Sequence, residues 1–110
     1  MNMQPVTLAQ IAEQMQQALQ YSERARTQQT LKRGLVLVLS CTATTWTLAM
    51  GRAGETPPSD DEVTTCLREF KVSPAFTLRT ERESKNGYSI VRVIWVRGQQ
   101  LSLFDLEVRA

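Results

Sequence analysis

The side chains best suited to chemistry are three consecutive acids, Asp60, Asp61 and Glu62. Clustered carboxylates can bind divalent cations or act as general acids and bases. They directly follow Ser59, however, and a serine with a glutamate three residues later is the capping-box pattern of a helix N-terminus. Acids in the first helical turn also interact favourably with the helix dipole. We therefore expect this cluster to be structural, and we expect no metal site.

The chain contains two cysteines and no histidine. Without histidine, Ser-His-Asp and Cys-His nucleophiles, two-histidine zinc sites and imidazole acid–base catalysis are excluded. Cys41 and Cys66 form no Cys-x-x-Cys motif, so their spacing supports neither zinc binding nor redox chemistry. We expect both thiols to be reduced and buried, in a cytoplasmic protein that is not an enzyme and needs no cofactor.

Basic side chains form a second kind of candidate site, for the phosphates of DNA. The 13 Lys and Arg against 11 Asp and Glu leave a net charge of only +2, which does not by itself indicate a polyanionic partner. Locally, cations gather at the end of the first predicted helix and on the last predicted hairpin, where they could contact nucleic acid. These candidates are Arg24, Arg26, Lys32, Arg33, Arg79 and Arg92. On the hairpin, Glu81 and Glu83 weaken the positive potential, and at the helix end the cations would equally complement the helix dipole.

The most informative segment is Gln100-Leu101-Ser102-Leu103-Phe104, near the C-terminal end of the sequence. It closely resembles the peptide by which bacterial replication and repair proteins bind the DNA sliding clamp, whose pattern is Gln-Leu-Ser/Asp-Leu-Phe. The resemblance covers five of the 110 residues. It implies a short anchor, in which an apolar pair enters a preformed pocket and a glutamine amide bonds to the pocket rim.

The resemblance assigns a role to each residue of this segment. Gln100 would bond to the rim of the clamp pocket, and Leu101 would contact the cleft between its subsites. Leu103 and Phe104 would fill the deep pocket, while Ser102 would be a tolerant spacer. The implied function is a small adaptor or inhibitor that binds the bacterial DNA sliding clamp in replication, in repair, or in a mobile element or phage.

Two other interpretations remain open. Leu106 and Val108 continue the apolar pattern, so Leu101–Val108 could instead be a fifth strand packed on the protein's own core. The chain would then be a protein–protein interaction module, either a homodimer or a complex subunit, without a link to the clamp. A small DNA-binding module is the third hypothesis.

Two helices are expected to position these sites. Thr7–Gln10 has the spacing of a capping box, and apolar residues then recur with helical spacing, which predicts a first helix that runs to about Lys32. A second helix should start after Ser59 and end near Lys71. Its apolar face comprises Val63, Cys66, Leu67 and Phe70.

A first hairpin is predicted within the uncharged window Gly34–Gly51. Leu35–Leu39 is a buried run of leucine and valine, and Thr45–Met50 alternates hydroxyl and apolar side chains. The window is barely long enough to cross a bilayer, and its serine and threonines favour two strands over a membrane helix. We therefore expect no membrane partner.

A second hairpin is predicted around the Asn-Gly turn at 86–87, which is the preferred two-residue turn. Counting outward from this turn sets Leu78 opposite Trp95 and Glu81 opposite Arg92. In this register apolar and charged side chains separate onto opposite faces, with Leu78 and Trp95 toward the core.

The whole pattern predicts one α+β domain in residues 1–98 and a tail in residues 99–110. The element order is α-β-β-α-β-β, and two helices pack on a mostly antiparallel four-stranded sheet, with the tail as the candidate fifth strand. A length of 110 residues with 42% hydrophobic residues fits a single core of this size.

Overall fold

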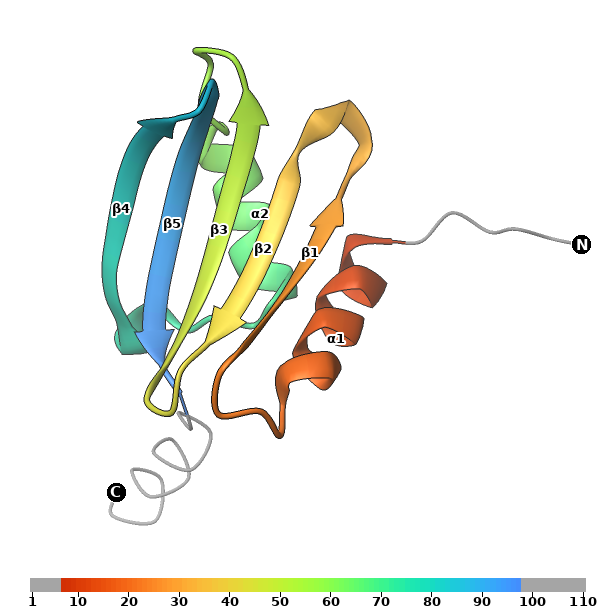
Figure 1. The fold of residues 1–110 in the computed structure, drawn as a ribbon, viewed down its shortest axis with the longest axis vertical. Coiled ribbons are helices and arrows are strands. Elements are labelled where there is room, and N and C mark those ends of the chain that lie inside the picture. The colour runs from red at the N-terminus through yellow and green to blue at the C-terminus, as the bar shows by residue number, and fades with distance from the viewer. Residues whose placement is uncertain (1–6, 98–110) are drawn as a thin grey trace, which may run out of the picture.

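The computed structural model of the protein describes residues 7–97, whose strands form one antiparallel sheet in the order β1-β2-β3-β5-β4 (Figure 1). The elements in chain order are α1 (Leu8–Leu19), β1 (Ala25–Thr30), β2 (Val36–Cys41), β3 (Thr45–Ala53), α2 (Asp60–Glu69), β4 (Thr77–Lys85) and β5 (Tyr88–Val96). Short 3-10 turns lie at Lys32–Gly34 and Pro74–Phe76. The predicted α+β class is confirmed.

Both helices pack on the same face of the sheet and share one core with it. In Figure 1, α2 lies behind the sheet and α1 lies beside β1. Alternate residues of β2, β3 and β5 point toward the helices, as the two-residue period of a strand requires. They are at most 1% exposed and include Leu37, Leu39, Leu48, Met50, Val91 and Val93. Among residues 7–97, no helix is long and apolar enough to cross a membrane.

The first helix is shorter than predicted, because it ends at Leu19 and residues 25–30 form β1. Apolar residues with helical spacing stop at Leu19, so a longer helix would have no face to bury. Residues 25–30 instead pair with the edge of β2 over the whole register from Ala25↔Cys41 to Thr30↔Val36. This pairing satisfies backbone groups that β2 would otherwise leave open. The predicted four-stranded sheet therefore has a fifth strand, at its β2 edge.

The second hairpin has the predicted turn and, over most of its length, the predicted register. Asn86 and Gly87 both have positive φ, 54° and 78°, as the tight hairpin turn requires, and Glu81 lies opposite Arg92. A bulge between Thr77 and Arg79 shifts the far end, so Thr77 instead of Leu78 lies opposite Trp95. The prediction that Leu78 points to the core is therefore wrong, and its side chain is 53% exposed. Bulges are frequent on edge strands such as β4 because they disrupt further pairing.

Both predicted capping boxes are present. In α1 the Thr7 side chain accepts from the backbone N–H of Gln10, and the Gln10 side chain accepts from the backbone N–H of Thr7. Ser59 and Glu62 make the same reciprocal pair at the start of α2. These bonds satisfy N–H groups that have no partner inside the helix.

Replacing the cap serine, Ser59→Ala, is expected to lower the free energy of unfolding by about 1 kcal/mol, because the N–H of Glu62 loses its acceptor. Urea denaturation followed by circular dichroism measures the loss. The matched control is Ser73→Ala, because Ser73 precedes the Pro74–Phe76 turn without making a side-chain cap bond. Equal losses in the two variants would contradict the capping role.

Candidate functional site at the end of strand β5

Two tryptophans lie side by side where β3 begins and β5 ends. Trp46 and Trp95 are direct neighbours in the register of these strands. Their rings stack nearly parallel, with 6.4 Å between centroids and 7° between planes, and offset rings at this separation attract each other. Trp95 is 3% exposed, whereas Trp46 is half-buried. One indole therefore belongs to the core and the other reaches the surface.

Arg97, directly after β5, contacts Trp46 and three backbone carbonyl groups. Its guanidinium carbon lies 5.4 Å from the centroid of the Trp46 ring, within cation–π range. The same guanidinium donates hydrogen bonds to the carbonyl oxygens of Thr42 at 2.6 Å, and of Gln20 and Glu23 at 3.4 Å. The structure therefore holds position 97 in place. The clamp-like segment begins three residues further along the chain.

A cavity of about 500 Å³ opens beside the tryptophans, between α1 and the end of α2. Trp46, Trp95 and Phe70 give it an apolar floor, and glutamines of α1 contribute to its rim. Gln16 donates from Nε2 to the carbonyl oxygen of Phe70 at 2.8 Å and so links the two helices at this point. Most of the lining is polar, since Glu13, Lys71 and Arg97 join the glutamines around the aromatic floor.

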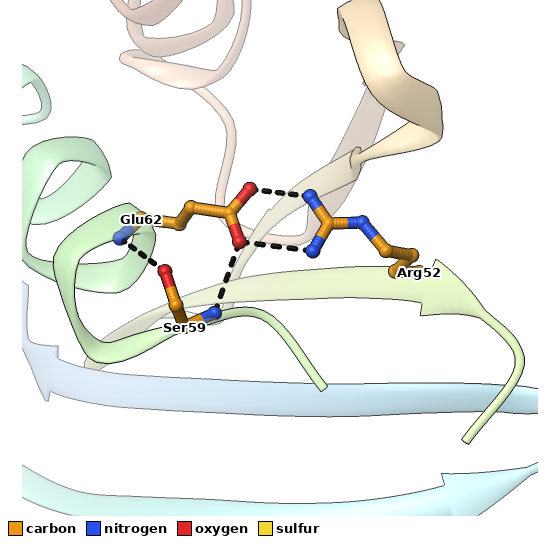
Figure 2. A network of polar contacts seen from close by, with 3 residues as sticks. All are labelled: Arg52, Ser59 and Glu62. Carbon is orange, nitrogen blue, oxygen red and sulfur yellow. Dashed lines mark hydrogen bonds and ion pairs between the residues drawn. The ribbon is translucent and has the colours of Figure 1, made fainter. Parts of the chain in front are cut away.

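Two of the three acids that open α2, Glu62 and Asp60, form ion pairs within the fold. Figure 2 shows Glu62 facing Arg52 of β3, whose two guanidinium nitrogens both donate to its carboxylate, while the Ser59 backbone N–H donates to the same group. Arg52 and then Ser59 lower the pKa of Glu62 from 4.5 to about 2. Asp60 pairs with Arg82 at 3.4 Å. In residues 7–97, no group of three or more His, Cys, Asp or Glu is arranged to hold a metal ion.

The Arg52–Glu62 pair predicts a dependence of stability on pH. Folding lowers the pKa of Glu62, so the ionised carboxylate adds to the free energy of unfolding. This contribution is complete above pH 4.5 and is lost as the pH falls from 4.5 through about 2. At neutral pH the free energy of unfolding of the Glu62→Gln variant should be about 1 kcal/mol lower than that of wild type. The loss is no larger because the ion pair is partly exposed to water. Urea denaturation at pH 7, 4 and 2.5 measures both effects.

Between pH 4.5 and pH 2, the free energy of unfolding of Glu62→Gln should change less than that of wild type. Asp60→Asn is the matched control, because the Asp60 side chain is 92% exposed and its ion pair is screened by water. A Glu62→Gln variant that keeps the full acid sensitivity of the wild type would contradict this assignment.

Both cysteines are free and buried, as predicted. The Cys41 thiol donates to the carbonyl oxygen of Ser22 at 3.4 Å. Burial, with a smaller effect of the Glu62 charge, raises the pKa of Cys66 to about 11. Because the thiolate is the reactive form, Cys66 should be inert to thiol reagents in the folded protein.

The first group of basic candidates does not form the expected ridge, because the helix that should carry it ends at Leu19. Arg24 precedes β1 and Arg26 lies on it, whereas Lys32 and Arg33 lie in the turn after it. A strand of six residues spans about 20 Å, so Arg24 and Lys32 stand at opposite ends of β1. All four side chains are exposed, but they lie around the two ends of a strand instead of along one helix.

The second group, Arg79 and Arg92, lies at the other edge of the sheet in an ion-pair network. Arg92 contacts Glu83 at 3.0 Å and Glu81 at 3.4 Å, and Arg79 contacts Glu81 at 3.0 Å. Arg79, and then Arg92, lower the pKa of Glu81. The structure thus separates these arginines from the first group and neutralises their charge locally.

The clamp-like residues Gln100, Leu101, Ser102, Leu103 and Phe104 lie outside the described residues, as does the alternative strand over 101–108. Comparison with protein-family models, curated proteins and solved structures finds no match to this chain.

The residues that sequence reasoning missed are Trp46, Trp95 and Arg97 as one unit. Each tryptophan stands near the end of a predicted hairpin, so pairing the two hairpins through β3 and β5 would have placed them together.

Proposed function

We propose that the protein is a small adaptor that binds the bacterial DNA sliding clamp through Gln100–Phe104. The observation that carries this proposal is the segment itself, which has a glutamine, two leucines and a phenylalanine at the spacing of clamp-binding peptides. Its proposed setting is DNA replication or repair in the bacterial cytoplasm, or a phage or mobile element that uses the host clamp.

The position of the segment supports the proposal. Arg97 is held by three carbonyl oxygens and by the face of Trp46, so the segment starts close to a fixed point of the domain. Leu103 is six residues after Arg97, and six residues of fully extended chain span at most about 22 Å. The anchor could therefore reach a partner that docks against the domain.

Short anchors of this kind derive their affinity from few side chains. Burying a leucine or a phenylalanine contributes about 1.5–3 kcal/mol, and the glutamine amide adds directional bonds at the rim. After the costs of ordering and association, we expect a dissociation constant in the micromolar range, about −8 kcal/mol.

The test is isothermal titration of the full chain into purified bacterial sliding clamp, with a synthetic peptide of residues 99–110 as competitor. The proposal predicts micromolar binding that the peptide displaces. Absence of binding at several hundred micromolar clamp would refute it. Binding that the peptide leaves intact would assign the contact to the domain and would equally contradict a linear anchor.

DNA is the alternative partner, and the same preparation tests it. Retardation of duplex or single-stranded DNA that weakens steeply with salt would indicate phosphate contacts. The separation of the basic groups and the ion pairs of Arg79 and Arg92 favour the clamp proposal over this alternative.

A further inference from the structure

The cavity beside the tryptophan pair lies where the described part of the chain stops. Val96 and Arg97 form part of its lining, and in Figure 1 the ends of β5 and α1 lie at the same end of the sheet. Residue 98 therefore leaves the domain from the wall of the cavity. Leu103 follows six residues after Arg97, a distance of at most about 22 Å. So short a link gives the residues that follow an effective concentration in the millimolar range at the cavity.

The floor of the cavity is aromatic, and part of it is open to solvent. Trp95 and Phe70 are buried, whereas Trp46 is only half-buried and reaches the surface here. A volume of about 500 Å³ lies within the range of pockets that enclose drug-sized ligands, so the cavity has room for more than one side chain. Removing the remaining aromatic surface from water is favourable, and an apolar group therefore suits the floor.

The rim of the cavity carries positive charge. Lys71 lies at the rim just after the C-cap of α2, and no carboxylate of residues 7–97 forms an ion pair with it. Arg97 is the second cation of the lining. Glu13 is the one acid of the described lining, and its carboxylate accepts a hydrogen bond from the Gln17 side chain at 3.3 Å. A ligand that combines apolar side chains with a carboxylate therefore complements both the floor and the rim.

The segment that follows the cavity wall has this composition, because Asp105 comes directly after Leu103 and Phe104. We propose that Leu103 and Phe104 dock in the cavity of their own domain while the clamp is absent, with Asp105 at the rim beside Lys71. The inference rests on the proposed function, since the two side chains that fill the clamp pocket then have two competing sites. The clamp binds only molecules in which the pair is free, so docking lowers the apparent affinity in proportion to the free fraction.

The first test needs no clamp, because both tryptophans of the chain line this cavity and report on it by fluorescence. Acrylamide quenching of the full chain should increase by about twofold in the double variant Leu103→Ala with Phe104→Ala, since a docked side chain covers most of the surface that it contacts. The matched control, Leu106→Ala with Val108→Ala, should quench as wild type. Equal quenching of wild type and the first variant would overturn the proposal. A difference that appears only at high protein concentration would also overturn it, because a second copy would then supply the docked pair.

A charge reversal at the rim tests the position of the segment. Lys71→Glu places a carboxylate beside Asp105, so it should release the pair and raise quenching toward that of the double variant. The matched control is Lys85→Glu, which makes the same change of charge at the end of β4, next to the hairpin turn and at the opposite end of β5 from Arg97. This control should quench as wild type. Equal quenching of the two lysine variants would overturn the proposal.

Titration with purified bacterial clamp separates a failure of docking from a failure of the proposed function. The peptide of residues 99–110 has no cavity to compete for its side chains, so it should bind the clamp about three- to tenfold more tightly than the full chain. Lys71→Glu should recover most of this difference. Equal affinities of peptide, wild type and Lys71→Glu would overturn docking and leave the clamp proposal standing. The expected quenching changes without clamp binding by any of the three would support docking in the cavity and refute the clamp proposal.

Discussion

Replacing Leu103 and Phe104 together by alanine is expected to weaken binding of the full chain to the bacterial sliding clamp by at least about 100-fold. Each of these side chains contributes about 1.5–3 kcal/mol when it is buried in a pocket, and 2.7 kcal/mol corresponds to a factor of 100 in the dissociation constant. Isothermal titration at clamp concentrations up to several hundred micromolar measures the loss.

The matched control for this prediction is Leu106→Ala with Val108→Ala, which removes two apolar side chains from the same tail but leaves Gln100–Phe104 intact. We expect this control to bind within about threefold of wild type. The alternative strand over Leu101–Val108 makes a different prediction, in which both double variants lower the melting temperature and wild type does not bind the clamp.

Phe70→Ala is expected to lower the free energy of unfolding by about 3–5 kcal/mol. The Phe70 side chain is 1% exposed, it belongs to the core shared by both helices and the sheet, and it forms part of the cavity floor. Removing the ring leaves a void beside the Trp46–Trp95 stack that the surrounding strands cannot close. Since small domains are stable by only about 5–15 kcal/mol, the variant should be close to unfolding at room temperature. Urea denaturation followed by tryptophan fluorescence measures the change.

Phe76→Ala is the matched control, because Phe76 is a phenylalanine of the same size that is only half-buried in the turn before β4. We expect it to lose less than half as much stability as Phe70→Ala. Equal losses would contradict the central position of Phe70 in the core.

The features that sequence reasoning predicted correctly are those in which the determining residues lie close together in the chain. The two capping boxes need a residue and its third neighbour, and the Asn-Gly turn sets the pairing of the residues next to it. The burial of Val93 and Trp95 on β5 follows from alternation within a few residues. The predicted burial of Leu35–Leu39 holds for Leu35, Leu37 and Leu39, whereas Val36 and Val38 on the other face are half-buried. These are local preferences, and nothing in the tertiary fold opposes them.

The candidate site was less predictable, because its parts come from distant positions. Trp46 and Trp95 are 49 residues apart in the sequence and meet through the pairing of β3 with β5. Arg97 then bonds to carbonyl oxygens of the loops that follow α1 and β2, which share no pattern with it in the sequence.

The sequence by itself determined where α2 begins, where the second hairpin turns and which alternate side chains are buried, since each depends on neighbours within a few residues. Only the tertiary structure determined that residues 25–30 form a strand. Their composition is mostly polar and gives no strong preference for helix or strand. They form β1 because they satisfy the backbone N–H and C=O groups of β2 that would otherwise lack partners. The same holds for Leu78, which the bulge on the β4 edge turned to solvent. Backbone hydrogen bonding between distant segments outweighed local propensity in both places.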